Sequence, residues 1–274
     1  MNERQGIAPW VKEESGRVGI VSEGPEGLNE IACLMSREGV GLSKVIVPRS
    51  PGGAGMVDGL CAIQTDSGTE MVVAVLERAS SPAVDGVLSQ VQSSDKPTVV
   101  CLLGGDPRRV WRAGAIPAER LDEAALRAVA WMRGWDQALI TSQLEDDDEK
   151  LASRAQVLRQ RLAPARRRVV ALLGNGTLCY EAQVMVGDRA EFVCEAPHRL
   201  SDILAEPSVA AILLRGEIKV QSGLEALTAA IRRTGTGDSP LVVVHVCGLG
   251  RETLAQGQER LRQAGAIVAD SNAA

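Results

Sequence analysis

Short unbroken apolar runs alternate along this chain with longer segments in which apolar residues recur every three or four positions. The unbroken runs predict buried strands, and the spaced segments predict helices with one face against a core. Ile31, Leu34 and Met35, for example, share one face of a predicted helix at 28–38. The regular alternation of strands and helices indicates an α/β fold with parallel sheets covered on both faces.

The two halves of the chain repeat one plan. Each half begins with a strand, a glycine-rich turn and a helix, and each holds a later strand opened by a proline, Pro97 or Pro240. The first half predicts strands at 17–22, 44–47, 70–76 and 97–103, and helices at 28–38, 56–66, 81–92 and 121–132. The second half predicts strands at 169–173, 190–193, 209–214, 241–246 and 266–269, and helices at 178–186, 200–205, 223–233 and 251–263. The repetition predicts two tandem flavodoxin-like domains, each with three layers.

The predicted domain boundaries follow changes in polarity. Residues 1–16 are polar and predict a flexible leader, 17–135 the first domain, 136–168 a charged helical connector, and 169–274 the second domain. The connector carries acidic residues near its start and arginines near its end, as the helix dipole favours. A basic anion clamp at Arg166–Arg168 is the alternative interpretation of those arginines.

Composition narrows the function classes. Of 274 residues, 45% are hydrophobic but only 2% are aromatic, so the cores must consist of Val, Leu, Ile and Ala. The net charge of −5 and the lack of a basic stripe interleaved with aromatic residues argue against nucleic acid as a partner. Neither an apolar run of 18 residues nor a signal-peptide pattern at 1–10 is present, so we expect no membrane segment and a cytoplasmic location. The six scattered cysteines and two histidines do not predict a metal site.

The turn at Gly174, Asn175, Gly176 and Thr177 is the main candidate for binding chemistry. It follows a strand and opens a helix, so backbone N–H groups at Thr177, Leu178 and Cys179 are expected to present the positive end of the helix dipole to an anion. An ordinary turn with a threonine N-cap is the alternative. Cys179 in the first helical turn is a candidate nucleophile, although a packing role fits the absence of a nearby histidine better.

Three further turns are weaker candidates. Gly24 and Gly27 lie in the matching turn of the first half, but Glu23 and Glu26 place carboxylates where an anion would bind, and Pro25 removes one N–H donor. Two other segments follow predicted strands and are expected at the rim of a site; they contribute Gly52 and Gly53, and Arg215 and Glu217.

These motifs resemble those of FdrA-type proteins, a branch of the succinyl-CoA synthetase α-subunit superfamily. The segment from Gly174 to Ala182 is similar to the family's "G-G-T-L-x-x-E-A" opening, and Gly19 and the run Gly27–Glu30 are similar to its first loop. The resemblance covers about residues 16–271 and does not include the family's N-terminal CoA-binding domain. The family's phosphorylated histidine, in a "G-H-A-G-A-I" segment, falls on Arg112, which cannot carry a phosphoryl group.

The resemblance implies a subunit of a carbamoyltransferase complex. Such a complex would act on oxamate- or oxalurate-like substrates, phosphate and carbamoyl phosphate, with this chain binding the small anionic substrate at its glycine-rich helix starts. Two alternatives are an acyl-CoA synthetase α-like subunit that binds CoA or phosphate, and a non-catalytic assembly subunit. Other subunits of a transferase complex are the expected partners, and a homo-oligomer is the alternative. The sequence itself indicates no catalytic residue and no certain cofactor.

Overall fold

The computed structural model describes residues 11, 13–48, 53–78, 83–173, 176–193, 200–217, 221–233, 239–247, 251–271 and 273. The chain forms two compact units. Unit 1 comprises Met1–Leu144, Gly176–Val184 and Ala273; unit 2 comprises Glu145–Asn175, Met185–Asn272 and Ala274. Each unit contains one sheet of five strands, and every strand pairing that the structure describes is parallel.

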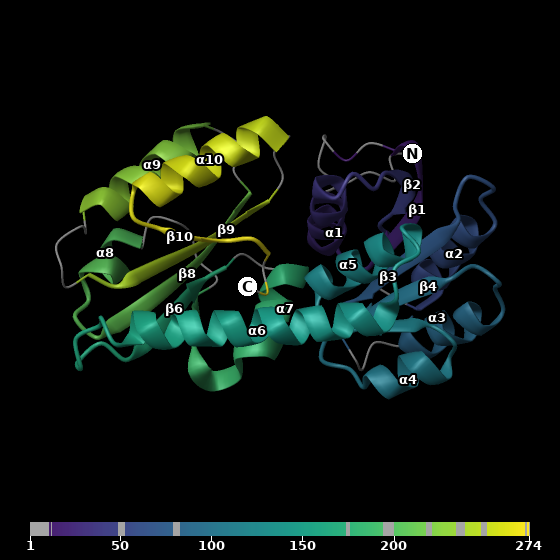
Figure 1. Cartoon of the computed structure of the whole chain (residues 1–274), viewed down its shortest axis with the longest axis horizontal. Helices are drawn as coiled ribbons and strands as arrows, with labels where there is room; N and C mark the ends of the chain where they lie inside the picture. Colours follow the sequence, from purple (N-terminus) through teal and green to yellow (C-terminus); the bar gives the residue numbers. More distant parts are fainter. Residues whose placement is uncertain are drawn as a thin grey trace. The chain divides into compact units, whose positions relative to one another are not determined.

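The sheet of unit 1 has the strand order β2-β1-β3-β4-β5, and β1 to β4 are labelled in Figure 1. Its first strand lies inside the sheet and its second at the edge, which is the order of flavodoxin-like folds. The elements are β1 (Glu13–Ser22), α1 (Pro25–Arg37), β2 (Leu42–Ile46), α2 (Gly53–Gln64), β3 (Met71–Leu76), α3 (Ala83–Gln92), β4 (Thr98–Leu102), α4 (Pro107–Arg112), β5 (Ile116–Ala118) and α5 (Leu121–Met132).

Both faces of this sheet are buried. Met71, Val73 and Val75 of β3 belong to one apolar cluster with residues of α1 and α5. The alternating residues of the same strand, Val72, Ala74 and Leu76, belong to a second cluster with residues of α2, α3 and α4. Because side chains alternate across a strand, an unbroken apolar run fills both layers at once.

The sheet of unit 2 repeats this topology. Its order, β10-β9-β8-β6-β7, again places its first strand inside the sheet and its second at the edge. The predicted fold class, two tandem flavodoxin-like sheets, is therefore confirmed. The elements are β6 (Arg168–Leu172), α7 (Thr177–Val186), a 3-10 turn (Gly187–Arg189), β7 (Glu191–Val193), α8 (Leu200–Ala205), β8 (Val209–Glu217), α9 (Gln221–Arg233), β9 (Leu241–Cys247), α10 (Arg251–Gln263) and β10 (Ile267–Ala269).

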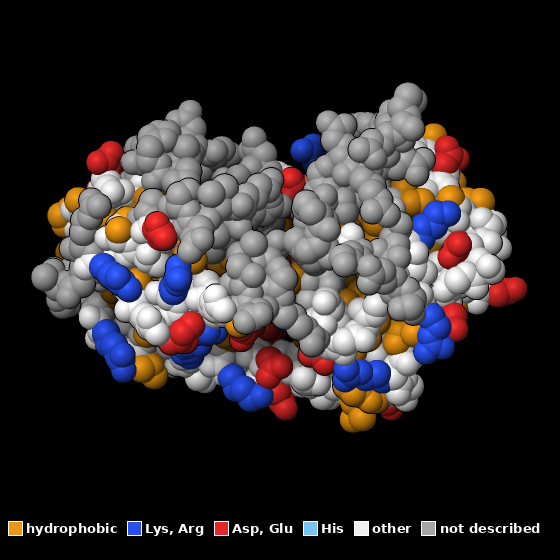
Figure 2. Space-filling model, turned by 90° about the horizontal axis from the view of Figure 1, so that it is seen from above, with side chains coloured by type: hydrophobic (Ala, Val, Ile, Leu, Met, Phe, Trp, Pro, Cys, Tyr) orange, Lys and Arg blue, Asp and Glu red, His pale blue; other side chains and the backbone are white. Residues whose placement is uncertain are grey.

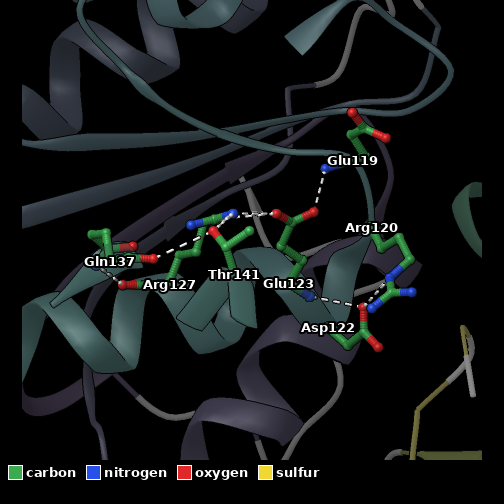
Figure 3. Close-up of polar contacts among 7 residues, drawn as sticks. All are labelled: Glu119, Arg120, Asp122, Glu123, Arg127, Gln137 and Thr141. Carbon is green, nitrogen blue, oxygen red and sulfur yellow. Dashed lines mark hydrogen bonds and ion pairs between the residues drawn. The ribbon is translucent and has the colours of Figure 1, made fainter. Parts of the chain in front are cut away.

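Helix α6 (Gln137–Arg159) continues the chain after α5, and a polar network fastens its first turns (Figure 3). Arg127 of α5 is buried; its guanidinium pairs with Glu123 at 2.7 Å and donates to Thr141 Oγ1 at 3.3 Å. Gln137 Nε2 donates to the Arg127 carbonyl at 3.1 Å, and Glu123 Oε2 accepts the Glu119 N–H at 2.8 Å. This network ties the start of α6 to α5.

Three segments differ from the sequence prediction. Strand β1 begins at Glu13, so the last residues of the predicted leader already pair with β2. Helix α2 begins at Gly53, which places Gly53 in a helix rather than in a flexible loop. The segment 107–118 forms α4 and β5, which the hydrophobic pattern did not indicate because the segment is short and contains proline, glycine and alanine.

Candidate functional site

The first glycine-rich turn lies at the carboxyl edge of the sheet of unit 1, where β1 ends and α1 begins. The Ser22 hydroxyl is buried and donates to the Gly24 carbonyl at 2.6 Å, and the Glu23 N–H donates to the Val75 carbonyl at 3.1 Å. Gly24 is the N-cap of α1, and no side chain caps that helix from this position. The turn is thus fixed by hydrogen bonds to itself and to the neighbouring strand β3.

The second glycine-rich turn also contributes to unit 1, because Gly176–Val184 belongs to that unit. Leu178 is fully buried in the same apolar cluster as residues of α1 and α5. Glu181 is also buried, and its Oε1 accepts the Leu121 N–H at 2.7 Å. Helix α5 lacks a side-chain cap from its own N-cap residue, so Glu181 supplies the acceptor from a distant part of the sequence.

Thr177 and Glu77 bring the two turns together within unit 1. Glu77 follows the last residue of β3, and its Oε1 accepts a hydrogen bond from the Thr177 hydroxyl. The Glu77 N–H in turn donates to Glu23 Oε2 at 2.7 Å. We call Glu23, Glu26 and Glu77 the acidic cluster.

Two glycines allow this close approach. A methyl group built on Gly24 would lie 2.1 Å from Glu77 Oε1 and 2.4 Å from Thr177 Oγ1. Gly176 has a φ of +106°, which favours glycine, and a methyl group there would lie 2.8 Å from the Glu26 carboxyl carbon. Carboxyl groups therefore pack directly against both helix starts.

The electrostatics of the site follow from this packing. Burial raises the pKa of the Glu77 carboxyl above its ordinary value, and the charges of Glu23 and Glu26 raise this pKa further. The Thr177 hydrogen bond and the charge of Arg78 oppose the rise. An anion about 5 Å from one ionised carboxylate is disfavoured by about 3 kcal/mol at an effective dielectric of about 20. A helix N-terminus contributes about 0.3 to 2 kcal/mol in the other direction, so the carboxylates decide the balance.

The remaining predicted site residues are placed as follows. Gly27 is buried in α1, where a methyl group would lie 2.8 Å from Thr177 Cγ2, so it belongs to the same cluster of contacts. Cys179 is buried in α7, as expected of a packing residue. Arg215 and Glu217 lie within β8, opposite His245 and Cys247 of β9. Gly174, Asn175 and Gly52 lie outside the described residues.

Glu77 is the site residue that the sequence analysis missed. It directly follows a buried strand, and β3 lies next to β1 in the sheet. Carboxyl ends of neighbouring parallel strands share one edge, where flavodoxin-like folds carry their sites. The position of Glu77 directly after a predicted buried strand was therefore the sequence signal that could have identified it.

Other chemistry is limited in the part of the chain that the structure describes. There, no three His, Cys, Asp or Glu side chains are grouped so that they could hold a metal ion. None of the described helices is both long and apolar enough to cross a bilayer. On the face drawn in Figure 2, the visible Lys and Arg side chains are interspersed with Asp and Glu and do not gather in one basic area.

Comparison with known protein families finds no match for this chain. Among curated proteins, YahF of Escherichia coli K12, described as uncharacterized, is 29% identical over 185 residues; the match covers 64% of this chain and 34% of YahF. The chain therefore spans about a third of the length of that relative.

Solved structures with similar folds include PH0766 from Pyrococcus horikoshii, with a TM-score of 0.33 and 11% identity over 95% of this chain and 62% of that one. Another is the dinucleotide-forming acetyl-coenzyme A synthetase 1 of Ca. Korarchaeum cryptofilum in its apo form, with a TM-score of 0.33 and 15% identity over 94% of this chain and 62% of that one. This chain covers less than two thirds of either protein.

Proposed function

We propose that this chain is a non-catalytic subunit of an FdrA-type acyl- or carbamoyl-transferring complex in the cytoplasm. The observation that carries the proposal is the acidic cluster, whose carboxyl groups pack against the two helix starts at which the family resemblance places an anion. Arg112 supports it, because this residue stands where the resemblance implies a phosphorylated histidine. The chain would then contribute structure and contacts to the complex, and its partners would bind the phosphate.

The test combines a binding assay with a purification. Isothermal titration of the purified chain with phosphate, CoA, oxamate and carbamoyl phosphate is expected to give no saturable heat up to millimolar concentrations. Co-expression with the neighbouring genes is expected to yield a stable complex. Saturable binding of phosphate or CoA to the chain alone would overturn the proposal.

A second test substitutes the acidic cluster and compares this variant with a matched control on α6. Glu26→Gln with Glu77→Gln removes two acidic groups and keeps their size. Phosphate binding that appears only in this variant would support the proposal that the carboxylates prevent anions from binding at the helix starts. Asp146→Asn with Glu149→Gln removes the same number of charges from exposed residues of α6 and also keeps side-chain size. This second variant should not gain phosphate binding, since the change lies outside the site.

A second candidate function is direct binding of a carbamoyl or oxamate group by this chain. It is favoured by the raised pKa of Glu77 and by the grouping of carboxyl oxygens, which accept hydrogen bonds from an amide NH2 group. In that case oxamate binds to the wild-type chain, phosphate does not, and Glu77→Gln weakens oxamate binding. The same titrations therefore separate the two functions.

A further inference from the structure

Helix α6 carries an incompletely covered leucine stripe. Of its 23 residues, all of which the structure describes, Ile140 is the one that is buried. Leu144, Leu151 and Leu158 recur every seven residues, which places them on one face of the helix. Leu151 is 36% exposed, and Leu144 and Leu158 are partly exposed. A seven-residue repeat keeps one leucine of each heptad on the side of the helix that would face a partner in a coiled coil.

The charges beside the stripe are divided between the two ends of α6. Acidic residues run from Glu145 to Glu149, whereas Arg154 and Arg159 lie in the second half of the helix. The Asp147–Lys150 contact, at 2.8 Å, is an exposed pair of the kind that contributes little to stability, so it does not hold Asp147 in place. A helix with acids at one end and arginines at the other is complementary to a second copy of itself in antiparallel orientation.

We propose that α6 pairs antiparallel with α6 of a second copy of this chain. A two-fold axis at Leu151 sets this residue against Leu151 of the second copy and Leu144 against Leu158 of the second copy. On the two flanks of the seam, the same axis sets Glu145 against Arg159 of the second copy and Asp147 against Arg154 of the second copy. One axis thus satisfies both the leucine layers and the charges, as a self-complementary two-fold interface requires.

The position of the axis gives a direct test by disulfide cross-linking. In a Cys61→Ser background, which removes an exposed thiol, Leu151→Cys should form a covalent dimer on mild oxidation. Val157→Cys is the control, because Val157 is 50% exposed on the same helix but lies off the stripe. Cross-linking of Val157→Cys as fast as that of Leu151→Cys would overturn the proposal.

The oligomeric state and its charge dependence complete the test. Light scattering after size exclusion should give the mass of a dimer for the wild type and of a monomer for Leu151→Lys, with unchanged circular dichroism. Asp147→Arg should weaken the dimer, and adding Arg154→Asp should restore it, because the exchanged charges again face each other. A wild type that is monomeric at every concentration would contradict the proposal. The proposal would also be contradicted if Leu151→Cys were protected from reaction with maleimide only when a gene-neighbour protein is bound, because the leucine stripe would then contact that protein.

Discussion

Replacement of Arg127 by leucine should destabilise unit 1 specifically. Arg127 and Glu123 form an ion pair whose side chains are only 11% and 14% exposed, with 2.7 Å between nitrogen and oxygen. Arg127→Leu leaves the Glu123 carboxylate largely buried without its cation, and it removes the hydrogen bond to Thr141. The Gln137 hydrogen bond is retained, because its acceptor is the backbone carbonyl of residue 127.

The expected cost follows from the burial of the pair. Breaking a fully buried pair by removing one partner costs about 3 to 5 kcal/mol. Because this pair retains slight exposure, we expect about 2 to 3 kcal/mol, which lowers the midpoint of thermal unfolding by about 4 to 12 °C in a unit of this size. The double variant Glu123→Leu with Arg127→Leu removes both charges and should recover most of this loss, apart from about 1 kcal/mol for the lost acceptor of the Glu119 N–H.

Tryptophan fluorescence reports the unfolding of unit 1, because all four tryptophans precede Asp136 in the sequence. The control is Lys150→Ala, which breaks a pair whose side chains are 73% and 50% exposed and should leave the unfolding midpoint close to that of the wild type. An Arg127→Leu midpoint equal to that of the wild type, or a double variant as unstable as the single one, would refute the reasoning.

Three further predictions concern the site and the contacts of α7. Gly176→Ala should lower the free energy of unfolding by about 1 to 3 kcal/mol, and by more than Gly187→Ala does. Both glycines have a positive φ, but of the two only the added methyl group at 176 would lie within 4 Å of another residue. Glu181→Ala should cost about 1 to 2 kcal/mol by removing the acceptor for Leu121, and hydrogen exchange should rise at the first turn of α5 while the last turn is unchanged. The folded-state pKa of Glu77 is raised, so the stabilising contribution of this group is present at low pH and is lost as the pH rises through that pKa. In urea unfolding, Glu77→Gln should therefore be more stable than the wild type at pH 7 and not at pH 4. The reverse order would contradict a raised pKa of Glu77.

The sheets could be predicted from sequence because their signals are local. The run Met71–Leu76 is apolar throughout, and the structure buries all six of its residues. The repeated strand, turn and helix at Arg17 and Val169 likewise predicted two similar domains, and the two sheets have equivalent strand orders. The short strand Ile116–Ala118 gave no such signal, because three residues are too few to show a period.

The site was less predictable because its contacts are distant in sequence. Glu23 and Glu26 lie in the turn itself, so the sequence already indicated a conflict with anion binding there. The partner of Thr177 is Glu77, one hundred residues away, and periodicity cannot select that pair. Nor could it place Leu178 in the core with α1 and α5, since an apolar residue in a first helical turn fits either sheet equally well.

The membership of Gly176–Val184, which contains most of α7, in unit 1 limits how this gene could be divided. A fragment that stops before Gly176 retains a complete sheet but leaves an apolar hole where Leu178 normally packs. A fragment that starts at Arg168 carries the other sheet together with a leucine that has lost its surroundings. The two halves of the sequence therefore cannot be exchanged as separate modules. A recombinant that keeps the first half intact would also have to keep α7, although this helix is encoded in the second half.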